Sequence, residues 1–162
     1  MKPKKGKTPF HIKRLIVSDE IMHRQIFALV KKVYKKDPAK ASAKDDARSD
    51  IDFTFDGYGV SVKVRDVKFF EKYGDILITE RYLRSGLPGE LIAGEADFYM
   101  YAIVDRFEED GNLLKVFMIP MNAMRALPGE TVTLWKKGMR MKAIDSSKCE
   151  EYVIYDATKN GE

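Results

Sequence analysis

Cysteine and histidine are scarce in this chain, with one cysteine, Cys149, and two histidines among 162 residues. A single cysteine excludes an internal disulfide, and so few sulfur and imidazole ligands nearly exclude a zinc cage. No apolar run approaches the ~20 residues that a membrane-spanning helix needs, and the basic N-terminus lacks the apolar stretch of a signal peptide. No GxxxxGK phosphate loop occurs, so an NTPase is not supported. We therefore expect an intracellular protein without a membrane segment.

The remaining composition is typical of a folded domain. Hydrophobic residues make up 44% of the chain and charged residues 33%, which supplies a packed core and argues against wholesale disorder. A length of 162 residues suits one domain and is short for two.

The formal charge of +4 is unevenly spread. Residues 1–14 hold six positive charges and no acid, so the remaining 148 residues sum to −2. We interpret 1–14 as a basic arm and 15–162 as the single domain. Such an arm can bind a polyanion by releasing counterions from its phosphates, although a solvated tail has the same composition. Its candidate phosphate contacts are Lys4, Lys5, Lys7, Lys13 and Arg14.

Local patterns predict a helix near the N-terminus. Ser18-Asp19-Glu20 is typical of a helix start, and Asp37-Pro38 of a helix end. Between them, apolar residues at helical spacing share one face: Met22, Ile26, Leu29, Val30 and Val33. Residues 37–49 have no hydrophobic pattern and predict a mobile loop.

The period then changes to two, which predicts strands. Residues 51–55 and 60–64 alternate around the turn sequence Asp56-Gly57-Tyr58-Gly59 and predict a β-hairpin. Long apolar runs predict two central strands of a sheet, Ala96–Val104 and Leu113–Ile119. The other expected elements are a strand at Ile76–Glu80, a loop at Arg84–Gly94, a short helix at Met121–Leu127, and strands at Thr131–Trp135, Met139–Ile144 and Tyr152–Tyr155. This order predicts a mixed α/β (α+β) domain.

The hairpin brings two aspartates within reach of a lysine, and two registers are open. If Gly57-Tyr58 form the turn, Asp52 lies opposite Lys63. If Asp56-Gly57 form it, Asp52 faces Ser61 and Asp50 faces Lys63. Both registers place the aspartates on the same sheet face as the lysine.

This grouping suits metal-assisted hydrolysis of a phosphodiester. Carboxylates such as Asp50 and Asp52 are hard ligands for Mg²⁺ or Mn²⁺, which polarises a phosphate and lowers the pKa of bound water. An ammonium group such as that of Lys63 stabilises the developing charge. Glu80 and Glu20 are candidates for further ligands. On a solvated hairpin, however, the same residues would be surface ion pairs worth ~0–1 kcal/mol.

Two groups of motifs resemble a known family. The first is Glu20, then Ser49-Asp50-Ile51-Asp52, then Val60-Ser61-Val62-Lys63. The second is Tyr73-Gly74-Asp75-Ile76-Leu77-Ile78-Thr79-Glu80, then Ser85-Gly86-Leu87-Pro88-Gly89, then Glu95-Ala96-Asp97-Phe98-Tyr99-Met100-Tyr101. Over roughly residues 18–120 the chain resembles the PD-(D/E)XK nuclease superfamily, and in particular its phage and restriction-type members.

The resemblance implies a restriction-endonuclease-like central sheet preceded by an N-terminal helix, with extra C-terminal strands. It implies a metal-dependent DNA endonuclease, an intracellular hydrolase of phage type that acts as a homodimer. Asp52 or Asp50, with Glu80, would bind Mg²⁺ or Mn²⁺, the carbonyl of Val62 would be a backbone ligand, and Lys63 would be the catalytic lysine. We expect DNA contacts outside the arm from Arg65, Arg81 and Arg84.

One position departs from the family pattern. Ser61 stands where the family has Glu or Asp, and a hydroxyl cannot supply a carboxylate's charge to a metal ion. Either another acid such as Glu80 substitutes for it, or the site is weakened or inactive. The second outcome describes a nuclease-fold module that binds nucleic acid or protein without cleaving. A third interpretation is an unrelated α+β interaction domain with these residues on its surface.

Overall fold

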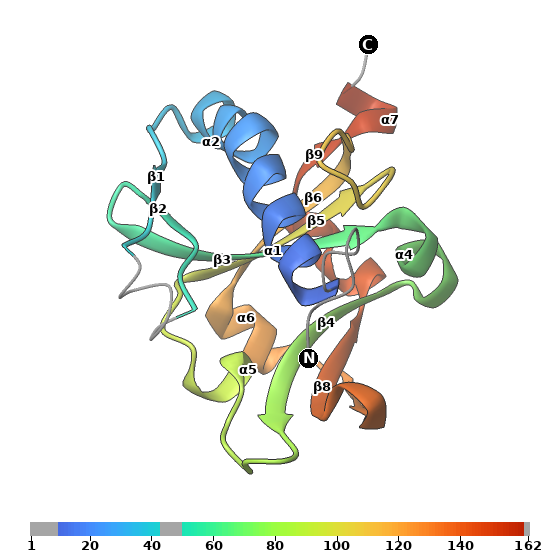
Figure 1. Cartoon of the computed structure of the whole chain (residues 1–162). Coiled ribbons are helices and arrows are strands. Elements are labelled where there is room, and N and C mark those ends of the chain that lie inside the picture. Colours follow the sequence, from blue (N-terminus) through green and yellow to red (C-terminus); the bar gives the residue numbers. More distant parts are fainter. Residues whose placement is uncertain (1–9, 43–49, 161–162) are drawn as a thin grey trace, which may run out of the picture.

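The computed structural model describes residues 10–42 and 50–160 as a mixed α/β domain with two sheets (Figure 1). The larger is a six-stranded mixed sheet of order β1-β2-β3-β5-β6-β9, and the smaller a three-stranded sheet of order β4-β8-β7. The strands are β1 (Ala39–Lys40), β2 (Phe53–Phe55), β3 (Tyr58–Asp66), β4 (Asp75–Tyr82), β5 (Phe98–Val104), β6 (Leu113–Pro120), β7 (Glu130–Leu134), β8 (Met139–Asp145) and β9 (Val153–Asp156). The helices are α1 (Phe10–Ile21), η1 (Met22–Ile26), α2 (Phe27–Tyr34), α4 (Val67–Tyr73), α5 (Glu90–Ala93), α6 (Met121–Ala126), η2 (Trp135–Lys137), η3 (Ser146–Tyr152) and α7 (Ala157–Asn160).

The N-terminal helix begins earlier than its capping signal predicts. It starts at Phe10, so the expected start at Ser18 is wrong, and residues 10–14 of the expected arm are helical. Lys4, Lys5 and Lys7 lie outside the described residues. Burial accounts for the difference: Val17 and Ile21 pack into the core and stabilise the earlier turns. The helix ends before Asp37-Pro38, as expected.

A π-helical segment, η1, interrupts this helix where it meets the β5–β6 turn. The Gln25 Nε2 donates to the Gly111 carbonyl (2.5 Å), and its Oε1 accepts from the Leu113 N–H (3.0 Å). The Arg24 Nη2 donates to the carbonyls of Glu109 (2.6 Å) and Gly111 (2.8 Å). These bonds attach the helix to the β5–β6 turn of the large sheet.

The predicted hairpin is confirmed, and the structure selects one of its two registers. Phe53 pairs with Val60 and Phe55 with Tyr58, which leaves Asp56-Gly57 as the turn. Asp56 (φ 48°) and Gly57 (φ 82°) both have positive φ, as a tight hairpin turn requires. The expected loop over 37–49 contains a short strand, because β1 pairs with β2.

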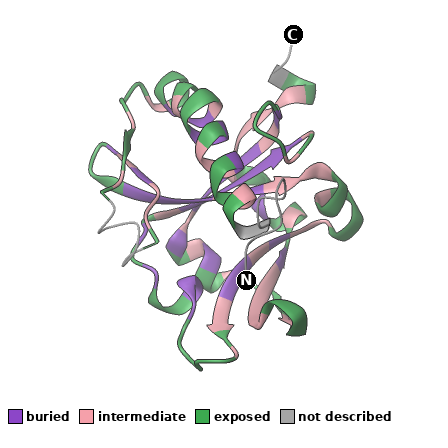
Figure 2. Ribbon diagram, in the orientation of Figure 1, coloured by how far each residue is buried: buried purple, intermediate pink, exposed green. Residues whose placement is uncertain are grey.

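The central strands are also where the apolar runs predicted them. β3 and β5 are parallel, β5 and β6 are antiparallel, and buried residues follow these strands (Figure 2). Val62 and Met100 belong to the core under α1 and α2. Tyr99 and Ile78 belong to the second core, against the β4-β8-β7 sheet. The mixed α/β class, the N-terminal helix and the additional strands are thus present.

The strand at 75–82 belongs to the second sheet, where β4 pairs with β8. The expected loop over Arg84–Gly94 contains α5, a single helical turn. β7 and β8 form the other strands of the second sheet, whereas β9 returns to the edge of the large sheet beside β6. In the described part of the chain, no helix is both long and apolar enough to cross a bilayer.

Candidate functional site

Asp52 lies where β2 separates from β3. Its N–H donates to the Val60 carbonyl (2.8 Å), and its Oδ2 accepts from the Val62 N–H (2.7 Å). The β2–β3 pairing ends at Val60, so this carboxylate satisfies the next backbone donor along the edge of β3. Asp50 is exposed and has φ 58°, which turns the chain away from the strand.

Lys63 and Ser61 lie on the face of β3 opposite the valines that pack under α1. The Lys63 Nζ is 3.9 Å from the Glu90 Oε2, and the lysine side chain is 38% exposed. Ser61 is buried and its hydroxyl interacts with the same glutamate. The sequence-predicted acid Glu80 is not the partner of this lysine; Glu90 is.

Glu90 is the unusual group of this site. It is 4% exposed, and its Oε1 has no hydrogen-bond partner in the described part of the chain. Burial raises its pKa, and Asp50 raises it further, whereas the Lys63 ammonium and the Ser61 hydroxyl lower it. A buried carboxylate oxygen without a donor is energetically costly, and groups of this kind are concentrated at functional sites.

The backbone around α5 holds Glu90 in place. The Gly89 N–H donates to the Glu80 carbonyl (2.8 Å), which ties the start of α5 to β4. A Cβ on Gly89 would lie 2.6 Å from the Thr79 carbonyl oxygen, so a side chain cannot be accommodated there without a shift. The Arg125 Nε donates to the Leu91 carbonyl (2.8 Å) and attaches the turn to α6.

Tyr99 lies in the core within electrostatic range of both carboxylates. It is fully buried on β5, and its hydroxyl donates to the Leu77 carbonyl (2.6 Å). Burial raises the pKa of Tyr99 well above its ordinary value; Glu90 and Asp52 raise it further, and Arg14 lowers it. Glu90, Asp52 and the α1 guanidinium therefore all act electrostatically on one phenol.

A groove of ≈ 350 Å³ adjoins this edge of β3. It runs between α1 and the strands, and its lining includes Asp52, Val62, Lys40 and Asp19. The Lys40 Nζ lies 3.1 Å from the Asp19 Oδ1 across it. Asp52 is thus accessible from the side of α1.

Several residues predicted from the sequence lie elsewhere. Glu80 pairs with Arg140, with 3.2 Å between its Oε1 and the Arg140 Nε, and Glu20 is exposed on α1. Among the described residues, the ion pair of Lys63 is with Glu90, and no ion pair joins it to the expected further ligands Glu80 and Glu20.

Arg65 is part of the fold and not of an exposed phosphate-binding surface. Its Nη1 donates to the Asp75 carbonyl (2.8 Å), the Asp75 Oδ1 (2.9 Å) and the Tyr101 hydroxyl (2.8 Å), and its side chain is 13% exposed. The expectation that it contacts DNA is therefore not supported by its position.

The other residues that we expected to contact DNA differ in whether their side chains already bind other groups of the protein. Lys13 pairs with Glu108 at 2.9 Å, and the Arg81 Nη1 donates to the Gly86 carbonyl (2.7 Å). Arg84 is exposed on the loop after β4, and Arg14 is half-buried on α1.

The carboxylates do not form a preassembled metal cage. Within residues 10–42 and 50–160, no three or more His, Cys, Asp or Glu side chains are close enough to hold one ion. Asp52 and Glu90 supply two carboxylates, one with an unsatisfied oxygen. Mg²⁺ is commonly bound by one or two carboxylates and several waters, and carboxylate oxygens are the hard ligands that it takes.

Sequence reasoning missed Glu90 as a site residue. Its local signal is a charged residue between Gly89 and the apolar pair Leu91-Ile92, which does not distinguish a buried acid from an exposed one. No family model, no curated protein and no solved structure matches this chain.

Proposed function

We propose that this protein is a metal-dependent nuclease that hydrolyses phosphodiester bonds at the Asp52–Lys63–Glu90 site. One observation carries the proposal: a carboxylate that is 4% exposed, with one oxygen lacking a donor, lies 3.9 Å from a partly exposed lysine. For packing alone, an apolar side chain would serve this position better, because a buried acid destabilises the fold. A bound cation would balance the negative charge of Glu90, and an anionic substrate would balance the positive charge of Lys63.

In this proposal Glu90 replaces the acid that the family has at the position of Ser61. The hydroxyl of Ser61, on β3, orients the Glu90 carboxylate. Glu90, on α5, supplies the negative charge that a serine lacks. Glu80 was the expected substitute for that acid, but it forms an ion pair with Arg140.

Each residue has a distinct task in the proposed reaction. Asp52 and Glu90 would hold the divalent ion, which when bound polarises the phosphate and lowers the pKa of a water ligand. Lys63 places its ammonium beside the scissile phosphate and stabilises its developing negative charge. Arg14 adds positive charge from α1, within electrostatic range of Tyr99.

DNA is the proposed substrate, and a homodimer the proposed assembly, as the family resemblance implies. Support for a polyanion comes from the basic residues of α1 and of the loop after β4, where Arg84 is exposed. Sedimentation of the chain with and without a DNA duplex measures the assembly directly.

The test is cleavage of supercoiled and branched DNA in Mg²⁺ or Mn²⁺. We expect cleavage by the unaltered protein, loss of cleavage in Lys63→Ala and Asp52→Asn, and no loss in Lys68→Ala. Lys68 is the matched control because it is an exposed lysine on α4, the helix that follows β3. Absence of cleavage with every DNA form and both metals would refute the proposal.

A second candidate function is a nuclease-fold module that binds nucleic acid without cleaving it. It is favoured by Ser61 and by the absence of a three-ligand metal group among the residues that the structure describes. The same assay separates the two candidates, since the module would retard DNA in a gel in either metal and leave it intact.

A further inference from the structure

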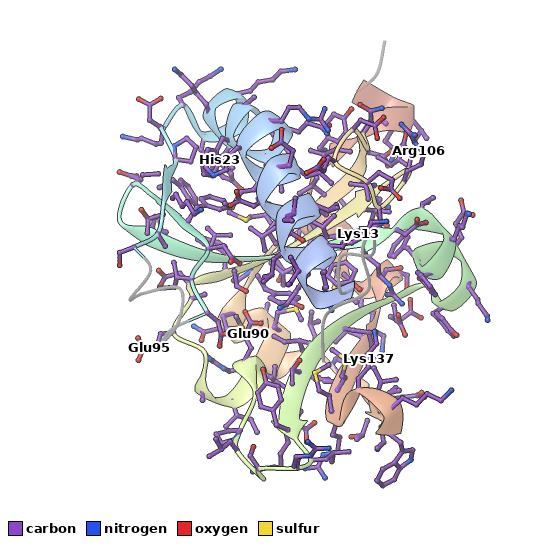
Figure 3. All side chains as sticks on the ribbon, in the orientation of Figure 1. Lys13, His23, Glu90, Glu95, Arg106 and Lys137 are labelled. Atoms are coloured by element: carbon purple, nitrogen blue, oxygen red, sulfur yellow. The ribbon has the colours of Figure 1, made fainter. Side chains whose placement is uncertain are left out.

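An exposed tryptophan lies at the end of the second sheet, away from the proposed catalytic residues. Trp135 is 80% exposed and stands in η2, the turn between β7 and β8. It is the only tryptophan in the chain. In the view of Figure 3, Lys137 of this turn and Glu90 lie on opposite sides of β4. An indole that remains in water contributes little to folding through burial, so it is free to contact a ligand.

The surroundings of Trp135 are strongly basic. Residues 134–142 contain Lys136, Lys137, Arg140 and Lys142 and no acid. The neighbouring loop and strand end, residues 81–89, contain Arg81 and Arg84 and no acid. The two segments are joined by a hydrogen bond from the Leu83 N–H to the Gly138 carbonyl (2.9 Å). Six cations therefore lie in two adjoining segments without an acid.

Three of these cations have no side-chain partner within residues 10–42 and 50–160. Lys136, Lys137 and Arg84 are exposed and make no hydrogen bond or ion pair through their side chains with other residues of the described ranges. Arg81, Arg140 and Lys142 are held by Gly86, Glu80 and Met124. We call Trp135, Lys136, Lys137 and Arg84 the aromatic-basic tip.

The turn presents these side chains outward on a well-defined backbone. Gly138 has φ 63°, and its N–H donates to the Trp135 carbonyl (3.1 Å), which closes the turn. β7 and β8 pair from Leu134–Met139 down to Glu130–Ala143 and carry the turn at their end. An indole and two ammonium groups are therefore offered together at the end of a paired ribbon.

We propose that the aromatic-basic tip binds single-stranded DNA, with the Trp135 indole stacked on an unpaired base and the lysines on the adjacent phosphates. Planar aromatic side chains combined with basic groups are the usual means of binding unpaired strands. A paired base offers only its edges in a groove, so stacking selects unpaired segments. The choice of polymer rests on the proposed function, but the contact does not depend on cleavage.

The charge pattern favours a polyanionic strand over a protein or a bilayer. In the turn at 134–138, Trp135 is the only exposed large apolar side chain, and two lysines follow it. An apolar protein partner would be disfavoured by the desolvation of those lysines. A membrane surface would attract the charge as well, so anionic vesicles serve as the competing probe.

Because Trp135 is the only tryptophan, its fluorescence reports on this site alone. We expect an oligothymidylate to quench the emission of the full-length protein in a saturable manner. Trp135→Ala, followed by the anisotropy of a labelled oligothymidylate, should weaken binding by about 5- to 150-fold, the range of one lost base–aromatic stack. Its unfolding midpoint in urea should equal that of the unaltered protein.

The lysines provide a second measurement, the salt dependence of binding, which would not change if they had only a structural role. Lys136→Ala/Lys137→Ala should lower the slope of log affinity against log salt by ~1.4, since each phosphate contact on a single strand contributes ~0.7. Lys32→Ala/Lys68→Ala is the matched control, because it removes the same charge from exposed positions on α2 and α4. Its salt slope should stay unchanged.

Two results would overturn the inference. One is oligothymidylate binding with unchanged fluorescence and unchanged affinity in Trp135→Ala. The other is a blue-shifted emission with anionic vesicles and no quenching by the oligonucleotide. Failure of the nuclease proposal is recognised separately: quenching should persist in Lys63→Ala whether or not the unaltered protein cleaves DNA.

Discussion

Replacing Lys63 with methionine should destabilise the protein in a pH-dependent way. The substitution keeps the length of the side chain and removes the ammonium that lies 3.9 Å from the Glu90 Oε2. At an effective dielectric constant of ~20, two unit charges at that separation attract by about 4 kcal/mol. Lys63 is 38% exposed, so solvent screening reduces the expected loss to about 1–2 kcal/mol of unfolding free energy at about pH 8.

The pH dependence follows from the direction of the Glu90 shift. Burial raises the pKa of Glu90 in the folded state above its ordinary value of 4.5, so the folded protein binds its proton more tightly than the unfolded chain. Stability therefore falls as pH rises from 4.5 through the raised pKa, and removal of Lys63 deepens this fall. Well below pH 4.5 the carboxyl of Glu90 is protonated in both states, and the cost of Lys63→Met should nearly vanish.

Urea unfolding of a double-mutant cycle measures this coupling. In a Glu90→Gln background, Lys63→Met should cost at most about 0.5 kcal/mol at every pH, because no buried charge is left without a partner. Lys68→Met, at an exposed position of α4, should stay within about 0.5 kcal/mol of the unaltered protein. An equal cost for Lys63→Met at low and high pH, and in both backgrounds, would refute the electrostatic account of the site.

Other parts of the structure lead to further predictions. Arg65→Ala should lower the unfolding free energy by about 2–4 kcal/mol in urea titrations, since it leaves Asp75 without its charged donor; a loss under 0.5 kcal/mol would contradict the observed network. Burial raises the pKa of Cys149 to about 11, so a thiol reagent at about pH 8 should label the protein only after unfolding, and rapid labelling of the native protein would show otherwise. Gly89→Ala would place a Cβ 2.6 Å from the Thr79 carbonyl oxygen and displace the start of α5, so DNA cleavage should fall at least about tenfold; wild-type rates would argue against a fixed α5.

Elements governed by local pattern were predictable from the sequence. The alternation on both sides of Asp56-Gly57 predicted the hairpin, and the apolar runs at 96–104 and 113–119 predicted the central strands. The residues that decide these elements are near one another in the chain. The choice between the two hairpin registers required the structure, because both place polar and apolar residues on the same faces.

Elements governed by distant contacts were not predictable in the same way. The helix starts at Phe10 because Val17 and Ile21 find a core built by strands far along the chain. Glu90 reaches Lys63 only because Gly89 is bonded to β4. Neither relation leaves a periodic or capping signal, so sequence reasoning chose Glu80, an acid at the end of a recognisable strand.

The most direct test of the account compares two glutamates in one assay of DNA cleavage. Glu90→Gln should lower the Mg²⁺-dependent rate by about 100-fold or more, since it removes a carboxylate from the proposed metal site. Glu80→Gln removes an acid of the same type that pairs with Arg140, and its rate should stay within about threefold of the unaltered protein. Loss of cleavage in Glu80→Gln with full cleavage in Glu90→Gln would contradict the assignment of Glu90 to the catalytic site.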